Sequence, residues 1–130
     1  TNISWNKDSD NLKVLSISDI LISDFSSVMF DWAFLFNKPF IYSNSDMNKE
    51  IYDMSELDEE PKRYEVMRKI GKELTKENLG DIKNLIENLK DNEEIQSEIE
   101  KAKAETWMFQ GSAAKNVADF LIKKQKELNT

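Results

Sequence analysis

The most apolar stretch of the chain lies in its first third and is divided by one polar turn. Residues 20–22 form a short aliphatic run of the kind that a fully buried parallel strand shows. Residues 23–27 interrupt this run with side chains that favour turns and helix N-caps. Residues 28–36 are almost entirely apolar, and a proline then introduces a second strand-like run at residues 40–42. This order predicts a βαβ unit with parallel strands and a right-handed crossover.

Helical periodicity dominates the remainder of the chain. Residues 2–5 and 72–74 are interpreted as short strands, the second at a sheet edge, and Thr75 as the N-cap of the helix that follows it. Helices are expected over residues 11–17, 61–70, 76–89, 91–106 and from 112 onward. The chain is therefore predicted to be a single α/β domain over residues 1–130, with a parallel sheet in its first third and a mainly helical part over about 61–130.

Composition narrows the possible functions. The 130 residues are enough for one domain or a piece of one, and a net charge of −7 argues against nucleic acid as a partner. The chain has no cysteine, which fits a cytoplasmic protein, and no apolar run long enough to cross a membrane. It shows no metal-ligand spacing, so neither a metal nor another cofactor is expected. The chain also lacks histidine, the commonest general base, and we assign no catalytic residue.

The polar turn is the candidate binding site. It follows the carboxyl end of a predicted strand and begins a helix, which is where α/β sheets bind ligands. The first N–H groups of a helix lack internal partners and carry partial positive charge, so a phosphate fits there beside the hydroxyls of Ser26 and Ser27. In the alternative interpretation, Asp24 or Ser26 simply caps the helix. Spacing alone leaves both interpretations open.

Asp31 is the second candidate. Its neighbours on the helix are apolar all round, which predicts a buried helix, and a buried carboxylate rarely lacks a partner. Asp31 also lies about one helical turn beyond Ser26 and Ser27, where a carboxylate is within reach of ribose hydroxyls. The alternative is a structural aspartate bonded to the backbone or to a basic side chain.

Three other segments invite functional interpretations. Residues 43–60 form a polar loop that would make a second wall of the site. The apolar cluster 107–109 either packs against the core at a helix break or faces a partner or membrane. The acidic helices within 61–106 are either solvated surfaces or a docking face for another protein, and the lysines of 123–126 are too few for stable membrane attachment.

Residues 12–42 closely resemble the signature of the CDP-glycerol:poly(glycerophosphate) glycerophosphotransferases, the teichoic-acid polymerases. That family shows a hydrophobic strand, then Asp-Tyr-Ser-Ser, then Phe-Asp and an apolar run ending in Lys-Pro or Arg-Pro. The corresponding residues here are Asp24-Phe-Ser-Ser, Phe30-Asp and Lys38-Pro. Residues 109–120 resemble the closing helix of the family more faintly.

The resemblance implies a GT-B architecture, in which two Rossmann-like domains face a cleft, and this chain would be the carboxyl-terminal half of the donor-binding domain. Such enzymes move glycerol phosphate from CDP-glycerol onto a lipid-linked polymer and release CMP, at the inner face of the cell membrane. By matching positions, Ser26 and Ser27 would bind the pyrophosphate, Asp24 would shape the turn and Asp31 would resemble a ribose-binding acid. With Ser23, these form the expected substrate-binding set.

Two departures from the family qualify this expectation. Phe25 replaces the usual tyrosine, and the histidines of the family, one of them in an upstream His-Pro motif, have no counterpart. The chain is therefore either a fragment of a longer enzyme, which we favour, or a degenerate relative of the family. In both cases we expect that it does not catalyse transfer by itself, which CMP release from CDP-glycerol by the isolated chain would contradict. The alternatives are a GT-B glycosyltransferase or related enzyme with another nucleotide-activated donor, and a non-catalytic interaction module. An exposed sheet edge would also allow a homodimer.

Overall fold

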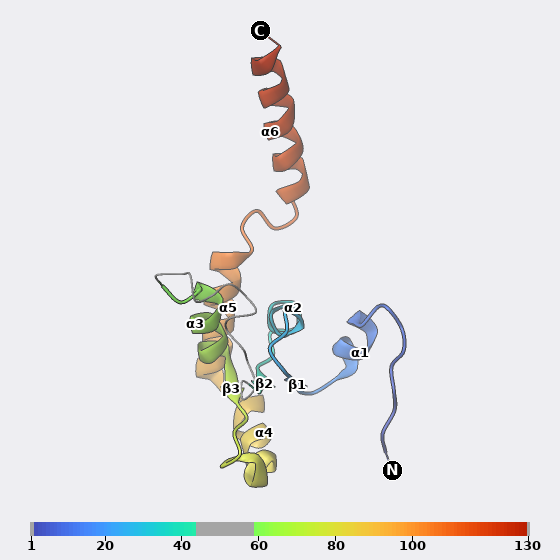
Figure 1. The fold of residues 1–130 in the computed structure, drawn as a ribbon, viewed down its shortest axis with the longest axis vertical. Helices are drawn as coiled ribbons and strands as arrows, with labels where there is room; N and C mark the ends of the chain where they lie inside the picture. Colours follow the sequence, from blue (N-terminus) through green and yellow to red (C-terminus); the bar gives the residue numbers. More distant parts are fainter. Residues whose placement is uncertain (1, 44–58, 130) are drawn as a thin grey trace.

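The computed structural model describes residues 2–43 and 59–129 and shows an α/β fold built on a three-stranded parallel sheet (Figure 1). Strands β1 (Leu21–Ser23), β2 (Phe40–Tyr42) and β3 (Gly71–Glu73) lie in that order across the sheet. Leu21 pairs with Phe40, and Phe40 pairs with Gly71, so the three strands begin at one level. The predicted class is confirmed, because this arrangement is a Rossmann-like partial domain.

Helix α2 (Val28–Phe36) connects β1 to β2, as the apolar pattern predicts. The helix ends where Asn37 adopts the left-handed conformation, with φ of 52°. The indole N–H of Trp32 donates to the carbonyl of Pro39 at 2.9 Å, which ties the buried face of α2 to the start of β2. Lys38 lies over the Trp32 ring and donates to the carbonyl of Ser18 at 2.6 Å, so the Lys-Pro pair of the signature has a structural role here.

The prediction that β1 is fully buried is wrong. Ile22 is 48% exposed, whereas all three residues of β2 are buried. The sheet order explains the difference, because β2 is the central strand and β1 lies at an edge. The apolar run predicted a strand correctly but not its place in the sheet.

A second helix and strand extend the sheet on the other side of β2. Helix α3 (Lys62–Ile70) begins after Pro61 and ends at Gly71, as predicted. Strand β3 starts one residue earlier than expected and forms the other edge of the described sheet. Gly71 lies directly against the Phe40 ring, so the close pairing of β2 and β3 depends on the missing side chain.

The helix expected from residue 76 begins later. The side chain of Asn78 accepts from the Thr75 N–H at 2.8 Å, and the Thr75 hydroxyl accepts from the Asn78 N–H at 3.3 Å. This reciprocal pair closes a turn, so Thr75 caps a turn and not a long helix. A 3₁₀ segment, η3 (Leu79–Asp81), and helix α4 (Ile82–Lys90) follow.

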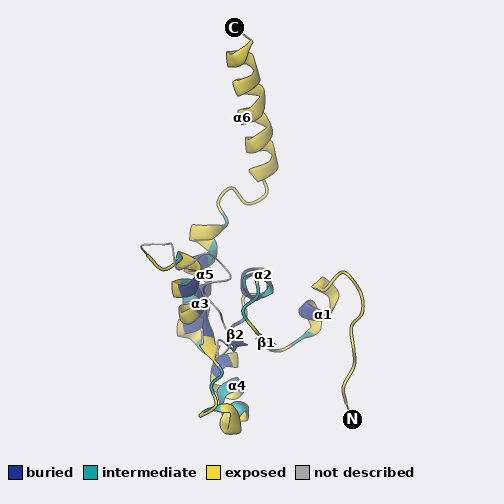
Figure 2. Ribbon diagram, viewed as in Figure 1, coloured by how far each residue is buried: buried dark blue, intermediate teal, exposed yellow. Residues whose placement is uncertain are grey.

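Helix α5 (Glu93–Thr106) starts at Asn92, whose side chain accepts from the Ile95 N–H at 3.0 Å. Its inner face packs on α3 and α2. Together with β2, these helices bury the hydrophobic core (Figure 2). The buried core residues are Leu15, Met29, Trp32, Ala33, Phe34, Phe40, Ile41, Tyr42, Tyr64, Met67, Ile70, Leu89, Ile95, Ile99 and Ala102.

Residues 2–5 and the last helix lie outside this core, whereas the first helix contributes Leu15 to it. Residues 2–5 form no strand, contrary to expectation, and Trp5 is 86% exposed. Helix α1 (Leu12–Ile17) is confirmed, with the Asp10 carboxylate accepting from the Leu12 N–H at 2.9 Å. Helix α6 (Ala113–Leu128) is also confirmed, but it projects away from the sheet and is exposed along its whole length (Figures 1 and 2).

Two further observations bear on function. The loop expected to form a second wall lies almost entirely outside the described residues, since only its ends, Ser43, Glu59 and Glu60, are included. In the parts of the chain that the structure describes, no helix combines the length and apolarity that crossing a bilayer requires.

Candidate functional site

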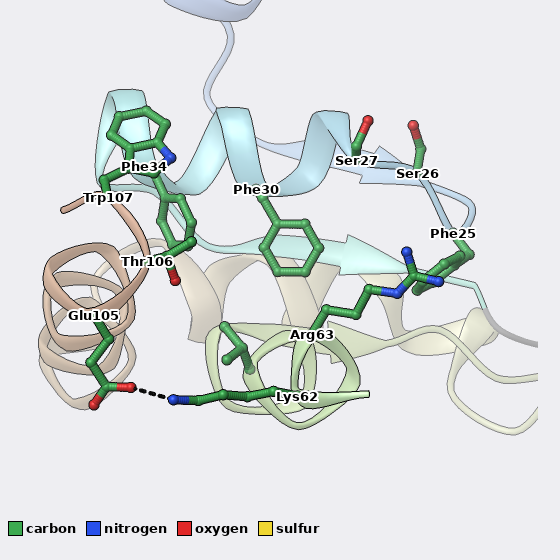
Figure 3. A pocket seen from close by; sticks show the side chains of 11 residues that line it. Phe25, Ser26, Ser27, Phe30, Phe34, Lys62, Arg63, Glu105, Thr106 and Trp107 are labelled. Atoms are coloured by element: carbon green, nitrogen blue, oxygen red, sulfur yellow. Dashed lines mark hydrogen bonds and ion pairs between the residues drawn. The ribbon is translucent and has the colours of Figure 1, made fainter. Parts of the chain in front are cut away.

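A groove of about 450 Å³ opens between α2, the first turns of α3 and the end of α5 (Figure 3). Its floor is apolar, and its polar groups lie at two places on the rim (Figure 3). Ser26, Ser27 and Arg63 lie near the N-terminus of α2, and Glu105 and Thr106 lie at the end of α5. The groove is lined by Phe25, Ser26, Ser27, Phe30, Phe34, Lys62, Arg63, Val66, Glu105, Thr106 and Trp107. This combination of an apolar floor and a few polar groups is typical of small-molecule sites.

Ser26 and Ser27 form the polar end of the groove. The Ser26 hydroxyl accepts from the Val28 N–H at 3.4 Å, a long contact that makes it a weak cap. Ser27 is the N-cap residue, yet its side chain makes no capping bond. Within the described chain, the backbone N–H groups of Ser26 and Ser27 have no acceptor. The bond from the Val28 N–H to the Ser26 hydroxyl therefore leaves the N–H groups of Ser26 and Ser27 and the Ser27 hydroxyl available to an anion.

Ser23 and Asp24 lie outside the groove lining. Ser23 ends β1, and its carbonyl accepts from the Ser43 N–H at 3.0 Å, which extends the ladder between β1 and β2 by one bond. Asp24 is exposed on the turn that follows. Of the predicted set, the structure therefore brings only Ser26 and Ser27 to the groove.

The prediction that Asp31 is buried is wrong. Helix α2 packs Met29, Trp32, Ala33 and Phe34 into the core, while Asp31 and Leu35 lie on its exposed side. The helix is apolar almost all round in sequence, but the described elements cover only one side of it. Asp31 lies one helical turn beyond Ser27, and no described group forms a side-chain hydrogen bond or ion pair with its carboxylate.

The apolar cluster at residues 107–109 is expected either to pack against the core or to face a partner or membrane, and its residues differ in this respect. Trp107 is half-buried and packs edge-on against Phe34, with ring centroids 5.5 Å apart, so it forms one end of the groove (Figure 3). Met108 and Phe109 are 66% and 63% exposed. The cluster therefore closes the groove with one ring and leaves two apolar side chains at the surface.

Two basic side chains of α3 line the rim. Lys62 forms an ion pair with Glu105 at 2.9 Å, which raises the pKa of Lys62 and lowers the pKa of Glu105. Both groups are exposed, so solvent screens this pair. Arg63 lies beside the rings of Phe25 and Tyr64, at the same end of the groove as the serine turn (Figure 3). Sequence reasoning missed Arg63 because it considered the charged helices within 61–106 only as solvated surfaces or a docking face for another protein.

These features define a Rossmann-like partial domain, in which the first β–α turn of a parallel sheet presents a helix N-terminus to an open groove. The family model for CDP-Glycerol:Poly(glycerophosphate) glycerophosphotransferase matches residues 3–123, and the chain belongs to this family. The expected family is thus confirmed over most of the chain.

A curated relative, the teichoic acid glycerol-phosphate primase of Bacillus spizizenii, is 30% identical over 125 residues. The match covers 93% of this chain but 30% of that protein, so the chain spans less than a third of the length of its relative. No solved structure matches the chain.

Proposed function

We propose that the chain is the donor-binding part of a glycerophosphotransferase that moves glycerol phosphate from CDP-glycerol onto a polymer of the teichoic-acid or capsule type. Family membership supports the donor, and the name of the Bacillus relative supports the polymer. The observation that carries the proposal is the serine turn at the N-terminus of α2, which faces an open groove with donors not used by the helix.

The proposed binding mode follows from the chemistry of the turn. The pyrophosphate accepts hydrogen bonds from the N–H groups of Ser26 and Ser27 and from the Ser27 hydroxyl. Ser23 and Asp24 hold the shape of the turn, and the apolar groove accommodates the base. Asp31 is one turn away on the exposed side of α2, where its carboxylate accepts from a ribose hydroxyl.

In this proposal the rest of the longer enzyme supplies the second domain of a GT-B architecture, the catalytic base and the site for the lipid-linked acceptor. The absence of histidine from this chain is consistent with that division of labour. The isolated chain then binds donor without transferring glycerol phosphate, and the complete enzyme works at the inner face of the cell membrane.

Calorimetric titration of CDP-glycerol, CDP and CMP into the purified chain tests the proposal. We expect CDP to bind more tightly than CMP. We expect Ser26→Ala/Ser27→Ala to weaken CDP binding by roughly 10-fold, since it removes the bond from the Ser27 hydroxyl to a charged oxygen and the Ser26 hydroxyl that accepts from the Val28 N–H. Ser16→Ala/Ser97→Ala is the matched control, because both of these serines are exposed and neither lines the groove. Equal CDP affinity in the two double variants would reject the proposed role of the serine hydroxyls.

The role of Asp31 has its own test within the same titration. If Asp31 accepts from a ribose hydroxyl, Asp31→Asn weakens CDP binding but leaves 2′-deoxy-CDP nearly unaffected. Equal losses for both nucleotides would show that Asp31 does not act through the 2′-hydroxyl. A panel with other nucleotide-activated donors separates CDP-glycerol from the alternative donors of GT-B glycosyltransferases.

A further inference from the structure

The chain has two arginines, Arg63 and Arg68, both on α3, and their surroundings differ. Arg68 is held by the Glu60 carboxylate through two hydrogen bonds, one of them 3.2 Å long. The neighbouring Lys62 is held by Glu105. Arg63 lines the groove, and within residues 2–43 and 59–129 no carboxylate forms an ion pair with it. The groove therefore contains a permanent positive charge that the described part of the chain does not neutralise.

Aromatic side chains hold this charge in place. The rings of Phe25 and Tyr64 stack at 4.8 Å, and the central guanidinium carbon of Arg63 lies 5.2 Å and 5.1 Å from their centroids. Three nearly equal distances place the guanidinium beside the stacked pair, where it contacts the π-systems of both rings. Arg63 also donates to the Tyr64 hydroxyl at 3.3 Å. These contacts restrict the arginine while leaving most of its N–H donors for a ligand.

The position of Arg63 in α3 is unfavourable for the stability of that helix. It lies in the first turn, where the helix dipole already contributes partial positive charge. Lys62 offsets this cost through Glu105, but the described contacts of Arg63 include no such anion. A cation at the positive end of a helix dipole, with no carboxylate of the described part of the chain paired to it, is the kind of departure that is expected at functional positions.

Arg63 and the serine turn line the same end of the groove. Phe25, against which the guanidinium lies, immediately precedes Ser26, and Figure 3 shows Arg63 directed at that end of the groove. Two sources of positive potential, the N-terminus of α2 and a guanidinium, thus meet at one rim. One phosphate fits a helix N-terminus alone, whereas a diphosphate carries a second anionic group for the arginine fork.

We infer that Arg63 is a diphosphate-binding residue of this groove, which binds the second phosphate of a nucleoside diphosphate while the serine turn binds the first. This inference rests on the proposed function. It predicts that Arg63 distinguishes diphosphates from monophosphates, because a monophosphate leaves the guanidinium without a ligand. Arg63→Gln should therefore weaken CDP binding about 10- to 100-fold and CMP binding by less than about 3-fold.

The test is titration of CDP, CMP and inorganic pyrophosphate into wild type, Arg63→Gln, Arg63→Lys and the control Arg68→Gln. Arg68 is matched in chemistry and shares the helix but does not line the groove. We expect Arg63→Gln alone to remove the preference for CDP over CMP, and Arg63→Lys to retain part of it, since lysine keeps the charge but loses the fork. Circular dichroism and thermal melting of each variant exclude unfolding.

The possible failures are distinguishable. If CDP binds through the serines and Arg63→Gln behaves like Arg68→Gln, the role of Arg63 is refuted and the proposed function stands. If pyrophosphate binds in an Arg63-dependent way but CDP does not bind, the diphosphate site stands and the nucleotide donor is refuted. If none of the three ligands binds the folded chain, both proposals are refuted for this chain.

Discussion

Replacing Gly71 by alanine tests the packing on which the sheet depends. A Cβ atom at position 71 would lie 2.4 Å from Cε2 and 2.8 Å from Cδ2 of the Phe40 ring, where ordinary contact begins at 3.4 Å. The ring must therefore move by about 1 Å, although Phe40 is completely buried and packs against Tyr42 with centroids 6.1 Å apart. Overpacking of this kind costs about 1–3 kcal/mol of unfolding free energy.

Gly80→Ala is the matched control, because a Cβ atom at that position meets nothing within 4 Å. Both substitutions restrict the unfolded chain and gain about 0.4–1 kcal/mol for that reason. The difference between the two variants therefore isolates the clash with Phe40. In urea unfolding, we expect Gly71→Ala to be less stable than Gly80→Ala by about 1–3 kcal/mol, with similar m-values.

A second substitution tests the assigned cause. Phe40→Leu shortens the obstructing side chain, so it should cost less in the Gly71→Ala background than in wild type. The coupling free energy from this double-mutant cycle should be about 1 kcal/mol or more. If Gly71→Ala is as stable as Gly80→Ala, or if the cycle shows no coupling, the close contact between β2 and β3 does not constrain the sheet as described.

Three further predictions concern the core, the alkaline limb of stability and α6. Trp32→Phe removes the hydrogen bond to the carbonyl of Pro39 and leaves a small void, so urea unfolding should show a loss of about 2–3 kcal/mol; a loss below about 0.5 kcal/mol would contradict this. Burial, and then the charge of Glu73, raises the pKa of Tyr42 above 10.0, so its contribution is complete below pH 10 and is lost as the pH rises through the folded-state value. Tyr42→Phe should therefore lose less stability than wild type between pH 9 and pH 11, and parallel curves would reject the assignment. Phe120→Ser should change the unfolding free energy by less than about 0.5 kcal/mol, because Phe120 is 58% exposed on α6; a larger loss would show that α6 packs in solution.

The βαβ unit could be predicted from the sequence because its signals are local. Residues 28–36 are apolar except for Asp31 over two and a half turns, and Pro39 separates them from the strand that follows, so the predicted bounds of α2 and β2 agree with the structure. The reciprocal bonds of Thr75 and Asn78 are also local, but an N-cap and a turn use the same residue types. Pattern alone could not choose between them.

Burial could not be predicted equally well, because it depends on which elements meet. Ile22 and Asp31 both belong to apolar stretches, yet one lies on an edge strand and the other on an uncovered side of α2. The order of strands across a sheet and the coverage of a helix are set by contacts distant in sequence.

The candidate site also has one part that the sequence predicts and another that only the fold brings together. The turn with Ser26 and Ser27 could be found because a strand, a polar turn and a helix follow each other directly. The other wall of the groove comes from α3 and α5, dozens of residues later, and only the fold brings Arg63 to Phe25. A cation in the first turn of a helix that starts after a proline is the signal that sequence reasoning could have used.

The tryptophans give the chain an internal optical probe. Trp5 is almost fully exposed, Trp32 is sealed in the core with its N–H bonded, and Trp107 lines the groove beside Phe34. In a Trp5→Phe variant, the fluorescence that remains comes from one indole isolated from solvent and one that a ligand would touch. Because Trp32 emits constantly while the fold persists, a change in emission at constant temperature reports on Trp107. Occupancy of the groove can therefore be followed without attaching a dye or labelling the ligand.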